Sequence, residues 1–171
     1  LAFTFFLTVI GLVTAYLTSA ACLILAVISY AISVSYTTVG KRSGLLGNFL
    51  VSTCVAIPFL YGSATTINTI SLKVILSASI AFLSNTGREI TKGIADVKGD
   101  KTKNIQTLAV RYDEKTAAIA ATLFYLSAVL LSPLPWLLNL VTIWFIPLVV
   151  ISDVGLVASS AMLLKNYSRE N

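Results

Sequence analysis

Long apolar stretches without charge, separated by short polar breaks, make up most of this sequence. A bilayer core about 30 Å thick is crossed by roughly 20 apolar helical residues, and six stretches approach that length. They are 1–18, 20–39, 46–66, 70–90, 116–132 and 137–164. The breaks between them contain Gly, Ser, Asn and Pro, which are typical of turns. The pattern therefore predicts an all-α, polytopic transmembrane helix bundle, with 1–171 as a single domain.

The composition narrows the class further. Hydrophobic residues make up 57% of the 171 residues and charged residues only 11%, whereas about 25% of a soluble domain is charged. A soluble globular domain and a disordered chain are both excluded, because 12 basic and 7 acidic side chains cannot cover so much apolar surface. The absence of His excludes imidazole bases and His metal ligands. Cys22 and Cys54 lie inside apolar runs and are expected to pack in the interior.

The distribution of basic residues predicts how the bundle is oriented. With six spans, eleven Lys and Arg residues fall on one side of the membrane and only Lys73 falls on the other. Basic loops remain in the cytoplasm, so this side is predicted to be cytoplasmic in a multi-pass protein of the cell membrane. The net charge of +5 is interpreted in the same way, and not as a nucleic-acid surface. The chain opens inside an apolar run without Met, so we expect a truncated start.

The polar segment 84–100 is the candidate site. Asp96 and Asp100 are four residues apart, so on a continuing helix their carboxylates share a face, as do Arg88 and Lys92 one and two turns earlier. Two aligned carboxylates suit Mg²⁺, which is commonly held by one or two carboxylates together with substrate phosphates. The cations that could contact those phosphates are Arg88, Lys92, Lys98, Lys101 and Lys103.

The same charges have a second interpretation. A solvated loop with salt bridges between residues four apart explains them about as well by spacing alone. Gly93 and Gly99 are interpreted as weakening the helix, so that the chain turns after Asp100. No phosphate-binding glycine motif is present, so nucleotide hydrolysis and dinucleotide binding have no support.

Two motifs resemble the UbiA family of intramembrane prenyltransferases. Asp-Val-Lys-Gly-Asp at 96–100, followed by Asn-Ile-Gln-Thr-Leu-Ala-Val at 104–110, is similar to the second Asp-rich motif of the family. A Tyr, a Lys-Arg pair and a Gly-Asn pair within 36–48 are similar to its signature between two spans. The resemblance covers essentially the whole chain and implies nine helices around a lipid-open cavity. The six stretches correspond to helices three to eight, and the first Asp-rich motif is not among them.

The resemblance implies transfer of an isoprenyl group from its diphosphate to an acceptor, with Mg²⁺ joining the diphosphate to the Asp motifs. Asp96 and Asp100 would hold the metal, and Lys41 would contact the diphosphate. Tyr36 and Asn48 would lie near the same pocket. Arg42 is the remaining candidate contact for the diphosphate.

The acceptor is open to more than one interpretation. The segment 88–101 looks most like the archaeal branch that transfers a geranylgeranyl group to geranylgeranylglyceryl phosphate, which forms an ether bond of archaeal membrane lipids. An aromatic acceptor, as in quinone biosynthesis, is the nearest alternative. Less favoured are a CDP-alcohol phosphotransferase, whose D-G-x-x-A-R motif is absent, a transporter, and a purely structural membrane subunit. The expected partners are an isoprenyl diphosphate, a lipid-like acceptor and membrane lipid, without nucleic acid.

Two further polar residues lie within predicted spans. Asp153 is a functional candidate because an intramembrane carboxylate is costly, although capping by a serine or a neighbouring helix explains it equally. Asn85 is expected either to line the cavity or to form an interhelical hydrogen bond.

Overall fold

The structure is a computed structural model that describes residues 2–66 and 69–166, and within these ranges it contains only helices and their connections. The six long helices are α1 (Ala2–Thr18), α2 (Ala20–Thr38), α3 (Leu45–Thr66), α4 (Leu72–Ala95), α7 (Glu114–Leu131) and α9 (Phe145–Lys165). The short helices are η1 (Gly40–Arg42), α5 (Val97–Thr102), α6 (Leu108–Arg111) and α8 (Leu134–Leu137). The prediction of an all-α membrane bundle is confirmed.

Four helical segments are long and apolar enough to cross a membrane: α2, α3, Glu114–Leu137 and α9. α1 is also apolar but is shorter, at 17 residues. α4 has 24 residues and becomes polar toward its C-terminal end. The last predicted stretch, 137–164, begins too early, because α8 ends at Leu137 and a turn with Asn139 at φ 55° precedes α9.

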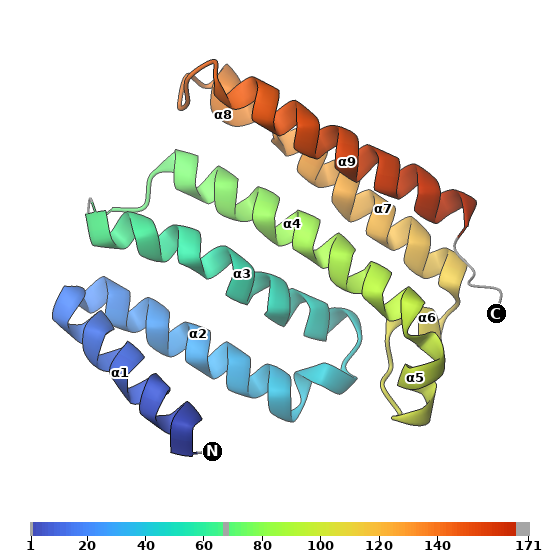
Figure 1. Ribbon diagram of the computed structural model, residues 1–171, viewed down its shortest axis with the longest axis horizontal. Helices are drawn as coiled ribbons and strands as arrows, with labels where there is room; N and C mark the ends of the chain where they lie inside the picture. The colour runs from blue at the N-terminus through green and yellow to red at the C-terminus, as the bar shows by residue number, and fades with distance from the viewer. Residues whose placement is uncertain (1, 67–68, 167–171) are drawn as a thin grey trace.

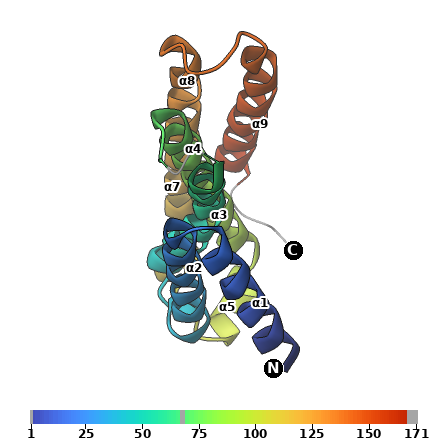
Figure 2. The same ribbon diagram turned by 90° about the vertical axis from the view of Figure 1, so that its left-hand side faces the viewer.

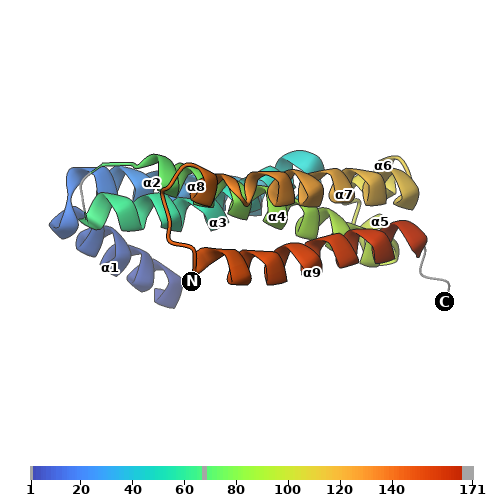
Figure 3. The same ribbon diagram turned by 90° about the horizontal axis from the view of Figure 1, so that it is seen from above.

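Each long helix packs against the next one along the chain, so the bundle is a row of neighbouring helices (Figure 1). α2, α3, α4 and α7 form a layer, and α1 and α9 lie on the same side of it (Figure 3). The end view shows how narrow this layer is (Figure 2). Along the helix axes, η1 and α5 lie at one end of the bundle and α8 lies at the other (Figure 1).

Small residues bring α4 and α7 together. Ala117, Ala121 and Ala128 are fully buried on α7. A Cβ at Gly87 would lie 2.8 Å from ring atoms of Tyr125, so only glycine allows this approach. The Tyr125 hydroxyl and the Thr91 hydroxyl are 3.2 Å apart and share a hydrogen bond. Close contact through small residues, with hydrogen bonds between helices, is the usual packing of membrane helices.

Hydroxyl and amide groups join α3 to α4. Ser52 and Thr86 are both fully buried, and the Thr86 hydroxyl donates to Ser52 Oγ at 2.8 Å. Asn85 Nδ2 donates to the same oxygen at 3.2 Å. Ser52 in turn donates to the carbonyl oxygen of Asn48 at 2.8 Å. This network fixes the first turns of α3, which carry Asn48, against the C-terminal half of α4.

Candidate functional site

The predicted Asp pair lies where α4 gives way to α5. α4 ends at Ala95, so the helix is interrupted at Asp96 and not first after Asp100 as expected. The redirected chain places Val97 in the buried cluster that also contains Ala109 and Ala117, and burial of this side chain favours the early break. The Asp100 N–H still donates to the Asp96 carbonyl oxygen at 2.8 Å, which keeps the two residues one turn apart.

The segment after α5 folds back over the end of α4. Asn104 has a φ of 53°, and the Ile105 N–H donates to the Asp100 carbonyl oxygen at 2.9 Å. Thr107 then caps α6, its hydroxyl accepting a hydrogen bond from the Val110 N–H. A Cβ at Gly93 would lie 3.3 Å from the Thr107 side chain. Gly93 therefore allows close packing against this segment. It also lies two residues before the end of α4, where a residue that weakens the helix was expected.

The connection between α2 and α3 closes the site from the other side. Gly44 has a φ of 61°, a conformation that favours glycine, and a Cβ there would overlap the carbonyl oxygen of Gln106. A Cβ at Gly47 would likewise overlap the carbonyl oxygen of Gly40. These approaches bring η1, which carries Lys41, to the same cavity as the Asp pair.

A cavity of about 190 Å³ lies between these elements. It brings together six of the residues predicted from the sequence: Tyr36, Lys41, Asn48, Lys92, Asp96 and Asp100. Its other lining residues are Gly40, Gly44, Gly47, Glu89, Gly93, Ile105 and Thr107. The remaining predicted cations do not line it and are exposed: Arg42, Arg88, Lys98, Lys101 and Lys103.

Glu89 and Thr107 line the cavity but were not singled out from the sequence. Glu89 is three residues before Lys92 and seven before Asp96, so these three share a face of α4 and its end. Helical spacing is therefore a signal that could have identified Glu89. Thr107 comes from a distant segment, and no local pattern indicates its position.

The charges in the cavity act on one another. The pKa of Asp100 is raised, first by burial and then by the negative charge of Asp96. The positive charges of Lys103 and Lys41 and a hydrogen bond from the Thr107 side chain oppose that shift. Two carboxylates that repel one another, with Lys41 facing them, form a site where an added cation would be stabilised.

The donor set fits Mg²⁺ bound together with a phosphate ligand. The described residues contain no group of three or more acidic, Cys or His side chains that could hold a metal by themselves. Mg²⁺ usually keeps several waters and takes one or two carboxylates plus substrate phosphates. Asp96 and Asp100 would supply the carboxylates, and Lys41 and Lys92 would supply positive charge for the phosphates.

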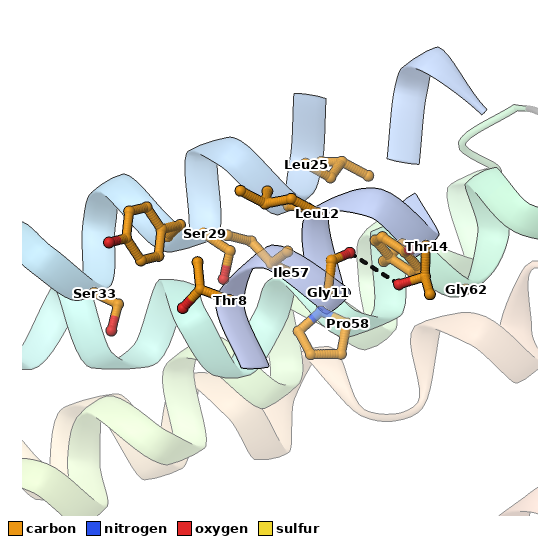
Figure 4. A pocket seen from close by; sticks show the side chains of 13 residues that line it. Thr8, Gly11, Leu12, Thr14, Leu25, Ser29, Ser33, Ile57, Pro58 and Gly62 are labelled. Carbon is orange, nitrogen blue, oxygen red and sulfur yellow. Dashed lines mark hydrogen bonds between the residues drawn. The ribbon is translucent and has the colours of Figure 1, made fainter. Parts of the chain in front are cut away.

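A second cavity of about 620 Å³ lies between α1, α2 and α3 (Figure 4). Its lining combines apolar groups such as Leu12, Leu25 and Ile57 with the hydroxyls of Thr8 and Ser33, and it contains no charged side chain. Ser33 is one helical turn from Tyr36 of the first cavity. The two cavities therefore follow one another along α2.

The two remaining candidate residues lie outside both cavities. Asn85 hydrogen-bonds Ser52 between α3 and α4, which is the second of its two expected roles. Asp153 lies on α9, where its Oδ2 is 2.5 Å from the Ser132 hydroxyl at the end of α7. It borders a separate cavity of about 250 Å³ near α8, at the end of the bundle away from the Asp pair (Figure 1).

The fold is that of a membrane helix bundle, and one end of it has a cavity lined by both carboxylates and lysines, which suits phosphate ligands. Comparison with known proteins identifies its family. The chain belongs to the UbiA prenyltransferase family, whose model matches residues 1–171. The resemblance inferred from the motifs is thereby confirmed.

Similar proteins within this family share one name. The Digeranylgeranylglyceryl phosphate synthase of Archaeoglobus fulgidus is 40% identical over 134 residues, which cover 77% of this chain and 46% of the relative. The enzyme of the same name from Hyperthermus butylicus is 32% identical over 175 residues, covering 98% and 58%. A solved structure described as "Structural and mechanistic insights into the biosynthesis of Digeranylgeranylglyceryl phosphate synthase in membranes" superposes with a TM-score of 0.82 at 31% identity, covering 96% and 58%. The chain spans about half the length of the curated relatives that it matches.

Proposed function

We propose that this chain carries the second Asp motif of a Mg²⁺-dependent prenyltransferase, as a single domain over 1–171. The reaction is transfer of a geranylgeranyl group from its diphosphate to geranylgeranylglyceryl phosphate, which forms an ether bond in archaeal membrane lipid synthesis. The observation that carries the proposal is the cavity in which Lys41 and Lys92 accompany Asp96 and Asp100. The names of the similar proteins support the choice of acceptor.

The chemistry follows from where charge develops. The bond between the allylic carbon and oxygen breaks, and its electron pair leaves with the diphosphate. Lys41 and Lys92 stabilise that developing negative charge. A bound Mg²⁺, held by Asp96 and Asp100, would neutralise further charge on the diphosphate. The acceptor hydroxyl oxygen attacks the same carbon to form the ether bond, and its proton passes to the departing diphosphate.

The isoprenyl chain is proposed to occupy the cavity between α1, α2 and α3. This cavity begins one turn along α2 from Tyr36 and is lined without charge (Figure 4). Its walls would shield an allylic cation from water. The diphosphate cavity is proposed to open on the cytoplasmic side, because basic residues of η1, α5 and α6 lie around the same end of the bundle (Figure 1).

The test uses the full-length protein that carries this chain, with labelled geranylgeranyl diphosphate and Mg²⁺. Geranylgeranylglyceryl phosphate and an aromatic acid are offered as acceptors in parallel. We expect transfer to the glycerophosphate lipid, loss of transfer when Mg²⁺ is chelated, and a loss of about 100-fold or more in Asp96→Asn and in Asp100→Asn. Glu114→Gln, which removes an acidic group outside the cavity, is the matched control.

A different result would contradict each part of the proposal. Transfer that survives both Asp substitutions would overturn the role of the Asp pair. Transfer to the aromatic acid alone would overturn the proposed acceptor. Full activity in the presence of chelator would overturn the requirement for metal.

A further inference from the structure

Glu89 is an acidic residue of the cavity for which the proposed reaction gives no role. Its side chain is only 9% exposed, whereas those of its two ionic partners, Arg88 and Lys92, are 66% and 54% exposed. A largely buried carboxylate next to a site for an anionic ligand opposes binding of that ligand, unless it performs a task of its own.

The contacts of Glu89 indicate this task. Lys92 Nζ donates to both oxygens of Glu89, at 3.0 Å to Oε1 and 2.9 Å to Oε2. Arg88 Nη1 donates to Oε1 at 3.2 Å. Only Lys92 of these two cations also lines the cavity. The ammonium group that is available to a diphosphate is therefore held by a carboxylate from its own helix.

This ion pair is weak enough to be exchanged. Glu89 and Lys92 are three residues apart on α4, and the Lys92 end of the pair is more than half exposed. Water therefore reaches the ammonium end of the pair, although not its carboxylate, and ion pairs that water screens contribute about 1 kcal/mol or less to stability. A diphosphate offers several charged oxygens and is a stronger acceptor for an ammonium group than one carboxylate.

We propose that Glu89 is a displaceable counterion for Lys92. It holds the ammonium group at the cavity wall when no ligand is bound, and Lys92 exchanges Glu89 for diphosphate oxygens when the ligand enters. Glu89 is thus a positioning residue that competes with the substrate for one cation. This inference rests on the proposed function, because it concerns the same diphosphate site.

The test measures binding of inorganic pyrophosphate with Mg²⁺ to the full-length protein by calorimetry. Four forms are compared: the parent protein, Glu89→Gln, Lys92→Gln and the double variant. Loss of the competing carboxylate is expected to tighten binding roughly two- to fivefold in Glu89→Gln. Lys92→Gln is expected to bind more weakly, and adding Glu89→Gln to it is expected to give no gain. Glu114→Gln is the control for removal of one negative charge elsewhere.

The coupling between the two substitutions decides the result. An equal gain in the presence and absence of Lys92 would show simple charge repulsion and overturn the exchange. Weaker binding in Glu89→Gln would show that this carboxylate supports the ligand, and unchanged binding would show that it does not compete; either result overturns the inference. Parent protein that fails to bind pyrophosphate overturns the proposed function as well, whereas parent binding that depends on Asp96 leaves that function standing.

Discussion

Gly44 lies directly against the backbone of Gln106, so that a Cβ on Gly44 would overlap the Gln106 carbonyl oxygen. This contact joins the turn between η1 and α3 to the segment that follows α5, although the two are about 60 residues apart in sequence. Lys41 lies just before Gly44 in the sequence and the Asp pair lies before Gln106, and all three charged residues line the cavity. The cavity is therefore closed by a backbone approach that only glycine allows.

Gly44→Ala is expected to destabilise the protein and to impair the cavity together. A φ of 61° costs an alanine about 1 kcal/mol or more, and the overlap with Gln106 adds to that cost. Thermal unfolding in detergent and pyrophosphate binding measure the two effects. Gly155→Ala is the control, because a Cβ at Gly155 in α9 meets no atom within 4 Å. Equal stability and binding in Gly44→Ala and the parent would contradict this account.

Lys41 and Arg42 are adjacent in sequence but differ in position. Lys41 lines the cavity, and its charge opposes the rise in the pKa of Asp100, whereas Arg42 does not line the cavity and is exposed. Loss of a charged hydrogen bond to a phosphate costs about 1.5–3 kcal/mol. Lys41→Gln is thus expected to weaken pyrophosphate binding roughly tenfold or more. Arg42→Gln is expected to change it little, and comparable losses in both would show that net charge alone acts at this end.

The sequence predicted the main helices well, because their apolar length is set by the membrane. The predicted start of the last helix was wrong, because the connection before that helix is itself apolar. Residues Leu138, Ile143 and Trp144 are as hydrophobic as a helix in the membrane, so hydropathy did not separate the connection before α9 from the helix. The break depends on the backbone at Asn139, whose positive φ is a local conformation that composition does not reveal.

The sequence predicted the chemistry of the candidate site, but not which of the neighbouring cations line its cavity. The Asp-rich motif and the resemblance of 36–48 to a family signature identified Asp96, Asp100 and Lys41, which the structure brings to one cavity. Composition cannot decide which of several neighbouring cations faces that cavity, so Lys98 and Lys101 were included with Lys92. Lys92 faces the cavity and the other two do not, because the helix breaks at Asp96 between them. Burial of Val97 favours that break.

Asp113 makes the stability of α7 dependent on pH. The Thr116 N–H donates to Oδ1 of Asp113 at 2.6 Å, and the Thr116 hydroxyl donates to Oδ2 at 2.8 Å. These two hydrogen bonds, the backbone one first, lower the pKa of Asp113 below its ordinary value of 3.8. A lowered pKa in the folded state means that the stabilisation is complete above the unfolded value and is lost as the pH falls through the folded value.

Asp113→Asn is expected to be less stable than the parent near neutral pH, and this difference should begin to shrink below about pH 5 and shrink further as the pH falls below the ordinary value of 3.8. Thermal unfolding in detergent across that range measures it. Thr116→Val keeps the backbone donor and removes the hydroxyl, so it should show a smaller dependence on pH than the parent. A difference between parent and Asp113→Asn that stays constant over the range would contradict the assignment.

Asp153 joins α9 to α7 through one hydrogen bond, with its Oδ2 2.5 Å from Ser132 Oγ. The other groups around its cavity are mainly apolar, among them Trp136, Phe145 and Val149. Ser132 is the hydrogen-bonding partner found for Asp153 among the described residues. Removal of this hydroxyl is therefore expected to leave the carboxyl group without compensation, at a cost of about 1–3 kcal/mol in Ser132→Ala.

A double-mutant cycle tests whether this pair is structural. Replacing both polar groups by apolar ones removes the uncompensated group, so Ser132→Ala with Asp153→Leu is expected to be more stable than Ser132→Ala alone. Unfolding in detergent gives the four stabilities, and prenyl transfer by the full-length protein gives the activities. The pair shares a cavity with Trp136 of α8, and α8 lies at the end of the bundle away from α5 (Figure 1), so activity is expected to follow the folded fraction in all four forms. A loss of transfer in a fully folded Asp153→Asn would instead give this carboxyl group a direct role in function.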